Sequence, residues 1–237
     1  MMTTASEKEY YEGFLKSASS KQWQRIGLDR RAGVAVPLFS IYSRKSVGLG
    51  EIPDLKLLVD WCLRNRMSVI QLLPMNDVGY DFRPYDAQST FALEPIYLSL
   101  ERLYGVHSLI WRSKILRLRK QFPAGGERVN YAVKRAKIEL LWEIYCKDGV
   151  RENTEFEDFR EKQHYWLEDF VIFRTLKEMH GERQWEAWDS VYRSRDYDAL
   201  QELRRSQAHK IRFYEWLQWQ IYLQFTELKH YAASRHV

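Results

Sequence analysis

Two short apolar runs in the N-terminal part of the chain predict β-strands. They cover residues 32–38 and 69–73, contain β-branched side chains, and are each followed by a polar loop with Gly or Pro. Between them, residues 53–66 begin at a proline and carry apolar side chains at helical spacing, at Leu55, Leu58, Val59 and Cys62. Because parallel strands need a crossover, this order predicts a βαβ unit whose strands are buried in a sheet.

From residue 104 to residue 233 the apolar positions follow helical spacing. The pattern predicts helices over 104–122 and 130–147, a helix that opens with a capping box at 154–157, an aromatic and aliphatic segment over 165–179, and one long helix over 198–233. The last helix carries a packing stripe at Ile211, Tyr214, Leu217, Ile221, Phe225 and Leu228. More than half of the chain is therefore expected to be helical.

Aromatic residues are frequent, with nine Trp and fifteen Tyr among 237 residues. Core packing and stacking against sugar rings both explain this, and composition does not separate them, although core packing is the commoner role. Trp185 and Trp188 are accordingly expected to anchor the core. The 45% hydrophobic content excludes wholesale disorder.

The net charge of +5 is a mild excess of 37 basic over 32 acidic residues. The densest basic cluster, residues 112–120, fits a solvated helix face better than a nucleic-acid or membrane surface. Cys62 and Cys146 lie on helical patterns and are expected to be buried free thiols, which suits a reducing cytoplasm.

No metal site, cofactor or membrane segment is indicated. The chain has no CxxC or HxxxH spacing, no apolar signal-peptide region at its start and no long uncharged apolar run. We therefore expect a cytoplasmic protein that is neither secreted nor membrane-spanning.

Several short motifs between residues 31 and 100 resemble the opening of one family of enzyme barrels. They are Gly33-Val34, Pro37-Leu38, Ser40-Ile-Tyr-Ser43, Gly48-Leu-Gly50, Gln71-Leu-Leu-Pro74, Pro84-Tyr85, Ser89, Phe91-Ala92 and Pro95. In this order they resemble glycoside hydrolase family 77, the 4-α-glucanotransferases or amylomaltases, and weaker similarity runs on through 166–170 and 185–188. The resemblance implies an α/β fold, an incomplete TIM (β/α)8 barrel with its first strands followed by a large helical insertion.

The resemblance divides the chain into three parts. Residues 1–29 are a polar lead-in, residues 30–103 hold the first β/α units and the substrate loop, and residues 104–237 form the helical insertion subdomain. In the family the next barrel strand follows this region, so we expect the chain to end before it. The C-terminal half of the barrel is then a candidate partner as a separate chain.

The loop at residues 75–89 is the best candidate site. Polar residues just past the carboxyl end of a parallel strand are where ligands are usually held, and planar polar groups with aromatic faces suit neutral sugars. The candidate substrate-binding residues are Tyr85, Ser89, Asp81, Arg83, Asn76 and, in the loop after the first strand, Ser43 with Tyr42 as a weaker candidate. The resemblance matches Tyr85 to a tyrosine that contacts bound glucan. Arg83 and Glu94 depart from the family, which usually has Ser and often Asn there.

The resemblance implies a retaining transfer of α-1,4-glucan segments between maltooligosaccharides. Such a transfer needs two carboxylates about 5–5.5 Å apart. No segment of this chain matches the family motifs that carry them, so no catalytic residue is assigned and the chain alone is expected to be inactive. A non-catalytic α-glucan-binding or partner-complementing module is the alternative, and a basic nucleic-acid binder is a weaker third.

Overall fold

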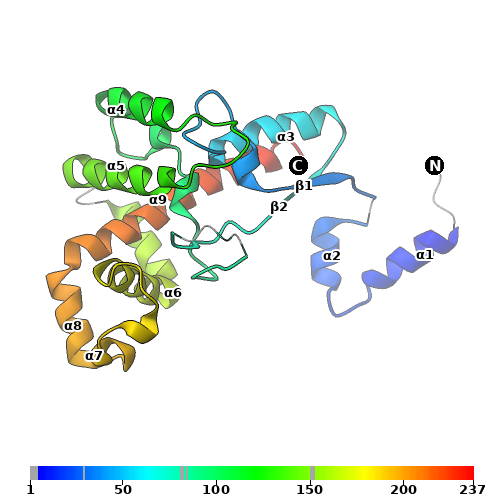
Figure 1. The fold of residues 1–237 in the computed structure, drawn as a ribbon. Coiled ribbons are helices and arrows are strands. Elements are labelled where there is room, and N and C mark those ends of the chain that lie inside the picture. Colours follow the sequence, from blue (N-terminus) through cyan, green and yellow to red (C-terminus); the bar gives the residue numbers. More distant parts are fainter. Residues whose placement is uncertain (1–4, 29, 81–82, 84, 150–152) are drawn as a thin grey trace.

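The computed structural model describes residues 5–28, 30–80, 83, 85–149 and 153–237, and shows a mostly helical chain (Figure 1). Two strands and nine α-helices are present in these ranges. Their bounds are α1 Ala5–Phe14, α2 Ser20–Ile26, β1 Gly33–Val36, α3 Leu55–Arg64, β2 Val69–Leu72, α4 Ser108–Gln121, α5 Ala132–Asp148, α6 Thr154–Met179, α7 Ser190–Arg193, α8 Tyr197–Ser206 and α9 Ala208–Ala233. Short 3-10 turns connect them, η1 Leu38–Ser40, η2 Ile52–Asp54, η3 Pro95–Tyr97, η4 Leu100–Arg102 and η5 Trp185–Ala187.

The predicted βαβ unit is present. β1 and β2 pair in parallel, with Gly33 opposite Val69 and Val36 opposite Leu72, and α3 forms the crossover between them. A Cβ at Gly33 would lie 2.3 Å from the Val69 carbonyl oxygen, so only glycine allows the strands to approach this closely.

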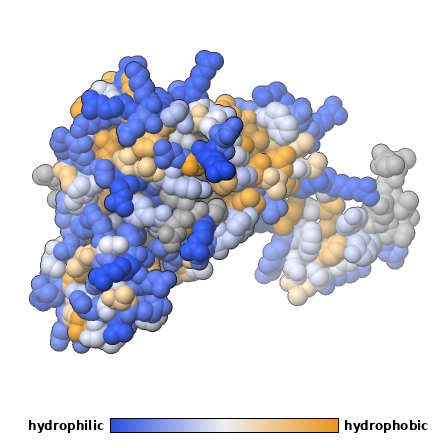
Figure 2. Space-filling view, viewed as in Figure 1, coloured by the Kyte–Doolittle hydropathy of each residue, from blue (hydrophilic) through white to orange (hydrophobic). Residues whose placement is uncertain are grey.

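The two strands are not buried on both faces, contrary to the expectation. Side chains alternate between exposed and half-buried along each strand, and Val69 is 40% exposed. The reason is that Ile70 and Leu72 pack against the core while no second layer of the described chain covers the other face. Figure 2 shows hydrophobic residues gathered over α3 and β1 on this side of the molecule.

The predicted helices are found, with three corrections. α6 is one continuous helix whose cap is Asn153, since the Asn153 side chain accepts a hydrogen bond from the Phe156 amide at 2.9 Å; Thr154 is its first helical residue and does not begin a capping box. The predicted helix over 198–233 is divided into α8 and α9 at Gln207, which has φ −109° and ψ 18°. Cys146 is exposed, and only Cys62 is buried as expected.

The larger of two hydrophobic clusters joins the first β/α units to the later helices, and the smaller one contains Ile172, Leu176, Trp188 and Leu203. The larger cluster contains Leu38, Ile52 and Ile96 together with α5 and α9, and α9 is buried on all sides from Phe213 to Ile221. This stretch is buried on every face, its polar residues Glu215, Gln218 and Gln220 included, so the predicted stripe understates the burial of α9. The division at residue 103 remains a prediction.

Three glutamines on α9 hold the segment from residue 93 to residue 104. The Gln218 amide accepts a hydrogen bond from the Leu93 N–H at 3.0 Å and donates one to the Leu93 carbonyl at 2.9 Å. Gln220 bonds the Tyr104 backbone and Gln224 the Ser99 backbone in the same two-sided way. These contacts satisfy backbone groups that are in neither a helix ladder nor a sheet.

The N-terminal helices α1 and α2 lie to one side of the main body, before the start of β1 (Figure 1). They contact each other through Phe14 and Trp23, whose ring centroids are 4.8 Å apart. In the described ranges no helix is both long enough and apolar enough to cross a bilayer.

Candidate functional site

A small pocket lies where β1 and β2 end. Its volume is about 80 Å³, and Phe39 after β1 and Pro74 and Asn76 after β2 form part of its wall. Leu49, Val78, Glu94, Tyr97, Val129 and Tyr131 complete the lining. The pocket therefore occupies the strand ends where the sequence predicted a ligand, and it offers aromatic faces beside a carboxyl and an amide.

A buried cluster of charged groups lies directly behind this pocket. Lys134 of α5 places its Nζ 2.7 Å from Glu94 Oε2 and 3.1 Å from Asp77 Oδ1, and it also donates to the Gly79 carbonyl. All three charged side chains are almost fully buried. One cation from the helical region thus joins both ends of the loop that begins after β2.

Burial and Lys134 shift the pKa values of the two carboxyl groups in opposite directions, and a different effect prevails at each group. For Glu94, desolvation dominates and raises the pKa to about 7, while Lys134 opposes the shift. For Asp77, the attraction of Lys134 and Arg174 and the hydrogen bond from the Gly79 amide together outweigh desolvation and lower the pKa. Near neutral pH, Asp77 is therefore ionised while Glu94 carries a proton part of the time.

These two carboxyl groups are held as structural groups rather than as a catalytic pair. Glu94 accepts hydrogen bonds from the Val78 and Ile96 amides as well as from Lys134, and Asp77 accepts one from the Gly79 amide at 2.9 Å. Shifted pKa values of this kind occur both in active sites and in structural ion networks. Here each carboxyl anchors backbone, so we assign neither a catalytic role.

Tyr80, at the edge of the same cluster, is surrounded by cations. Lys134 Nζ lies 5.2 Å from its ring centroid and the guanidinium carbons of Arg135 and Arg174 lie 5.2 and 5.3 Å away. Arg174 is itself held by a two-pronged ion pair with Glu182, at 2.7 and 2.5 Å. This arrangement fixes the loop against α6 as well as α5.

A second buried ion pair connects the loop after β1 to the same helix. Lys137 Nζ lies 2.7 Å from Glu51 Oε1 and 2.7 Å from the Ile96 carbonyl. Beside it, Ser46 donates to Asp54 at 2.7 Å. Desolvation raises the pKa of Glu51 despite the attraction of Lys137. Two lysines one helical turn apart thus hold both strand-end loops on α5.

Of the predicted site residues that the structure describes, Asn76 alone lines the pocket. Its side-chain amide donates to the Thr90 carbonyl at 3.0 Å, and its backbone pairs with Leu93. Ser43 lies in the loop after β1, where its Oγ accepts from the Lys45 amide at 3.1 Å and closes a turn. Tyr42 packs against Gly125, where an added Cβ would come within 2.8 Å of the ring.

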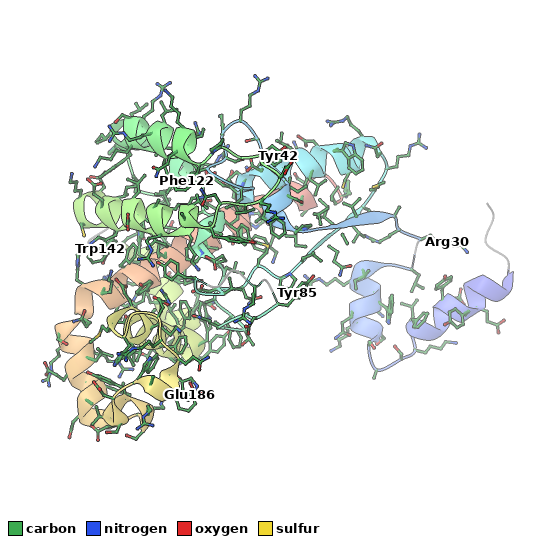
Figure 3. All side chains as sticks on the ribbon, in the orientation of Figure 1. Arg30, Tyr42, Tyr85, Phe122, Trp142 and Glu186 are labelled. Carbon is green, nitrogen blue, oxygen red and sulfur yellow. The ribbon has the colours of Figure 1, made fainter. Side chains whose placement is uncertain are left out.

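The other predicted residues lie along the outer part of the loop. Ser89 Oγ accepts hydrogen bonds from the Phe91 and Ala92 amides, and Arg83 pairs with Asp86 at 2.9 Å on the surface. Tyr85 is 77% exposed, and Figure 3 places it well away from Tyr42, on the side of the N-terminal helices. Asp81 lies outside the described residues. The loop therefore presents Tyr85 as an open ring, apart from the pocket.

Sequence reasoning missed Lys134, Lys137 and the inward position of Glu94. A signal was available, because both lysines lie on the same face as Val133, Leu140, Leu141 and Ile144, all of which are buried. A lysine on an apolar face needs a buried acidic partner. Among the described residues, no group of His, Cys, Asp and Glu side chains is arranged to hold a metal.

The comparisons with known proteins agree on one group of enzymes. The family model of glycoside hydrolase family 77, described as 4-alpha-glucanotransferase, matches residues 36–237. A 4-alpha-glucanotransferase of Chlamydia pneumoniae is 36% identical over 226 residues, which cover 93% of this chain and 42% of that protein. This chain thus spans less than half the length of that relative.

Solved structures show the same similarity of fold. The amylomaltase from Streptococcus agalactiae in complex with acarbose superposes with a TM-score of 0.73 at 24% identity, over 88% of this chain and 42% of that one. The amylomaltase from Corynebacterium glutamicum gives a TM-score of 0.66 at 21% identity, over 92% of this chain and 30% of that one.

Proposed function

Because the chain belongs to glycoside hydrolase family 77, the 4-alpha-glucanotransferases, we propose that it forms the N-terminal part of an enzyme that transfers α-1,4-glucan segments between maltooligosaccharides. The main support for this proposal is that the family model matches residues 36–237. The pocket at the ends of β1 and β2 supports the proposal, since strand ends are where barrel enzymes hold their substrates. The protein would act in the cytoplasm and without a cofactor.

In this proposal the chain supplies one wall of the glucan cleft. Asn76 and Tyr131 border the pocket and the open ring of Tyr85 lies further out on the loop, so a sugar chain would meet hydrogen-bonding groups and an aromatic face in turn. Ser43, Ser89, Arg83 and Asp81 complete the proposed binding set. The incomplete (β/α)8 barrel would be closed by further strands, which would also bring the catalytic carboxylates.

Binding of maltoheptaose to the 237-residue chain, measured by calorimetry, tests this assignment. Tyr85→Ala is expected to weaken the affinity about threefold to tenfold, because about 1 kcal/mol of ring contact is lost. Tyr10→Ala is the matched control, since Tyr10 is an exposed tyrosine on α1. Equal affinities for the wild type and the Tyr85 variant would refute the role of Tyr85.

An assay with maltotriose separates the enzyme part from the alternative. We expect no glucose release by the chain alone, because its two buried carboxyl groups near the pocket are engaged by Lys134 and by backbone amides. Activity restored by adding a C-terminal half of a family member would support the enzyme part. Glucan binding without restored activity would favour a non-catalytic binding module.

A further inference from the structure

A groove lies between α6, η5, α7 and α8, at the end of the molecule farthest from α1 and α2 (Figure 1). Its volume is about 340 Å³, within the range of about 300–1,000 Å³ typical of small-molecule sites. Glu186, labelled in Figure 3, marks the η5 turn beside it. None of the residues that line this groove also lines the pocket at the ends of β1 and β2.

Aromatic side chains form the groove and differ in how firmly they are held. Trp188 is 7% exposed, stacks on His180 at a centroid distance of 5.5 Å and contacts Phe173 at the same distance. Trp185, on the same turn, is 52% exposed. The Trp188 ring is thus buried and the Trp185 ring is exposed. The expectation that both tryptophans anchor the core is therefore wrong for Trp185.

The indole N–H of Trp188 has no acceptor among the described residues, although the nitrogen is buried. A buried donor without an acceptor is unfavourable, and an apolar occupant of the groove would leave it so. An occupant that carries oxygen acceptors would satisfy it. Trp188 lines the groove but its nitrogen is closed off from solvent, so the groove wall must shift locally for that oxygen to reach it.

The polar groups at the rim favour an occupant rich in hydroxyl groups. Arg195 and Asp169 form an ion pair with N–O distance 2.7 Å, and Arg193 adds a further cation to the rim. Guanidinium and carboxylate groups also present several hydrogen-bond donors and acceptors in a plane. Arg195 has φ 55°, a left-handed conformation, in the turn between α7 and α8.

We propose that this groove is a second carbohydrate site, which binds one segment of an α-1,4-glucan on Trp185. A sugar supplies a C–H face for the open ring, a hydroxyl oxygen for the Trp188 N–H, and hydroxyls for the rim. The choice of an α-1,4-linked sugar rests on the proposed function, whereas the choice of a hydroxyl-rich ligand rests on the groove itself. A long glucan held here would be retained near the enzyme while its end is processed elsewhere.

The Trp188 indole N–H resonance of the ¹⁵N-labelled 237-residue chain gives a direct test. The signal is assigned as the one that Trp188→Phe removes. Addition of maltoheptaose is expected to shift it in a saturable way as the N–H gains an acceptor, whereas sorbitol at equal mass should not. An unmoved resonance in the presence of saturating maltoheptaose would overturn the proposal.

Two variants separate this groove from the pocket at the strand ends. Trp185→Ala is expected to weaken the maltoheptaose affinity read from the Trp188 signal at least fivefold, and Trp61→Ala, which removes an exposed tryptophan on α3, to leave it unchanged. Tyr85→Ala should also leave the Trp188 titration unchanged. If Tyr85→Ala abolishes the Trp188 titration, the groove is not a separate site. If the Trp188 signal titrates with maltoheptaose but Tyr85→Ala does not change the affinity measured by calorimetry, the groove proposal is supported and the assignment of Tyr85 fails.

Discussion

Lys134 is the residue on which the candidate site depends. It lies on a helix at least 40 residues away in sequence from the carboxyl groups that it neutralises, Asp77 and Glu94. Removing one partner of a buried ion network leaves the others as uncompensated charges, which costs far more than the network contributes as a whole. The loop after β2 therefore owes its conformation to a residue from another part of the chain.

Substitution of this lysine tests that dependence. Lys134→Met is expected to lower the free energy of unfolding by about 3–5 kcal/mol, because Asp77 and Glu94 stay buried without their cation. Urea unfolding measures the change, with Lys120→Met, an exposed lysine on α4, as the control expected within about 0.5 kcal/mol of wild type. Adding Asp77→Asn and Glu94→Gln to Lys134→Met should recover part of the loss; no recovery would mean that packing, not charge, explains the effect.

Glu94 should also give the fold a specific pH dependence. Burial raises its pKa from an ordinary 4.5 to about 7. Between these values the native state holds a proton that the unfolded chain has released, so the contribution of Glu94 to stability falls as the pH rises through this window. The lowered pKa of Asp77 acts at lower pH: its contribution is complete above the ordinary value of 3.8 and is lost as the pH falls from there toward the lower native pKa.

Comparison of wild type with Glu94→Gln isolates this effect. The wild-type free energy of unfolding minus that of the variant is expected to decrease from pH 5 to pH 8, since only the wild type has a carboxyl to deprotonate. Urea unfolding at several pH values gives the difference, in which the titration of other groups cancels. A difference that is constant or rises with pH would contradict a raised pKa at Glu94.

At the scale of elements, α9 is the part of the helical region that most determines the shape of the first β/α units. It is buried on all sides from Phe213 to Ile221 and holds the segment from residue 93 to residue 104 through Gln218, Gln220 and Gln224. These contacts join positions 116 to 125 residues apart, so the segment has no local reason to adopt its path.

Substitution of a glutamine on α9 should therefore destabilise the segment from residue 93 to residue 104, which is distant in sequence. Gln224→Leu is expected to cost about 1–3 kcal/mol, because the Ser99 N–H and carbonyl stay buried without their partners. Gln201→Leu, at a partly exposed glutamine on α8, is the control. Urea unfolding gives the cost, and hydrogen exchange should show faster exchange of the Ser99 amide in the Gln224 variant. An unchanged Ser99 amide would show that another contact holds the segment.

At the scale of the molecule, the sheet of two strands is open. β1 and β2 pair only with each other in the described chain, and the nearby surface of α3 adds exposed Leu57, Trp61 and Leu63. Strand edges and apolar surface of this kind attract other chains. This is the surface that the remaining strands of a barrel would cover under the proposed function.

The 237-residue chain is therefore expected to self-associate in solution. Val69→Lys places a charge on the exposed face of β2 and should lower the mean molar mass measured by light scattering. Val191→Lys, at a similarly exposed valine on α7, should not change it. A monodisperse wild-type monomer at high concentration would show that the open sheet does not mediate association.

The local elements could be read from the sequence because their causes are local. β-branched runs specified β1 and β2, and the apolar spacing specified α3, although Pro53 lies in the turn η2 just before it. The same spacing placed α4 and α5 within a few residues. Short motifs in order also indicated the family, since the matched residues stand in one segment. None of these inferences required knowledge of the tertiary contacts between elements.

Tertiary structure alone decided which polar residues lie inside and which candidates meet. Lys134 and Lys137 lie on the apolar face of α5, but their acidic partners are identified only once α5 is placed over the loops, because these partners are 40 to 86 residues away. The same holds for the site: Asn76 reached the pocket, Tyr85 stayed on the outer loop, and Trp188 was buried while Trp185 was not. Hydrophobic periodicity records which face of an element is apolar, whereas the pairing of charges and the walls of a pocket arise only when distant elements pack together.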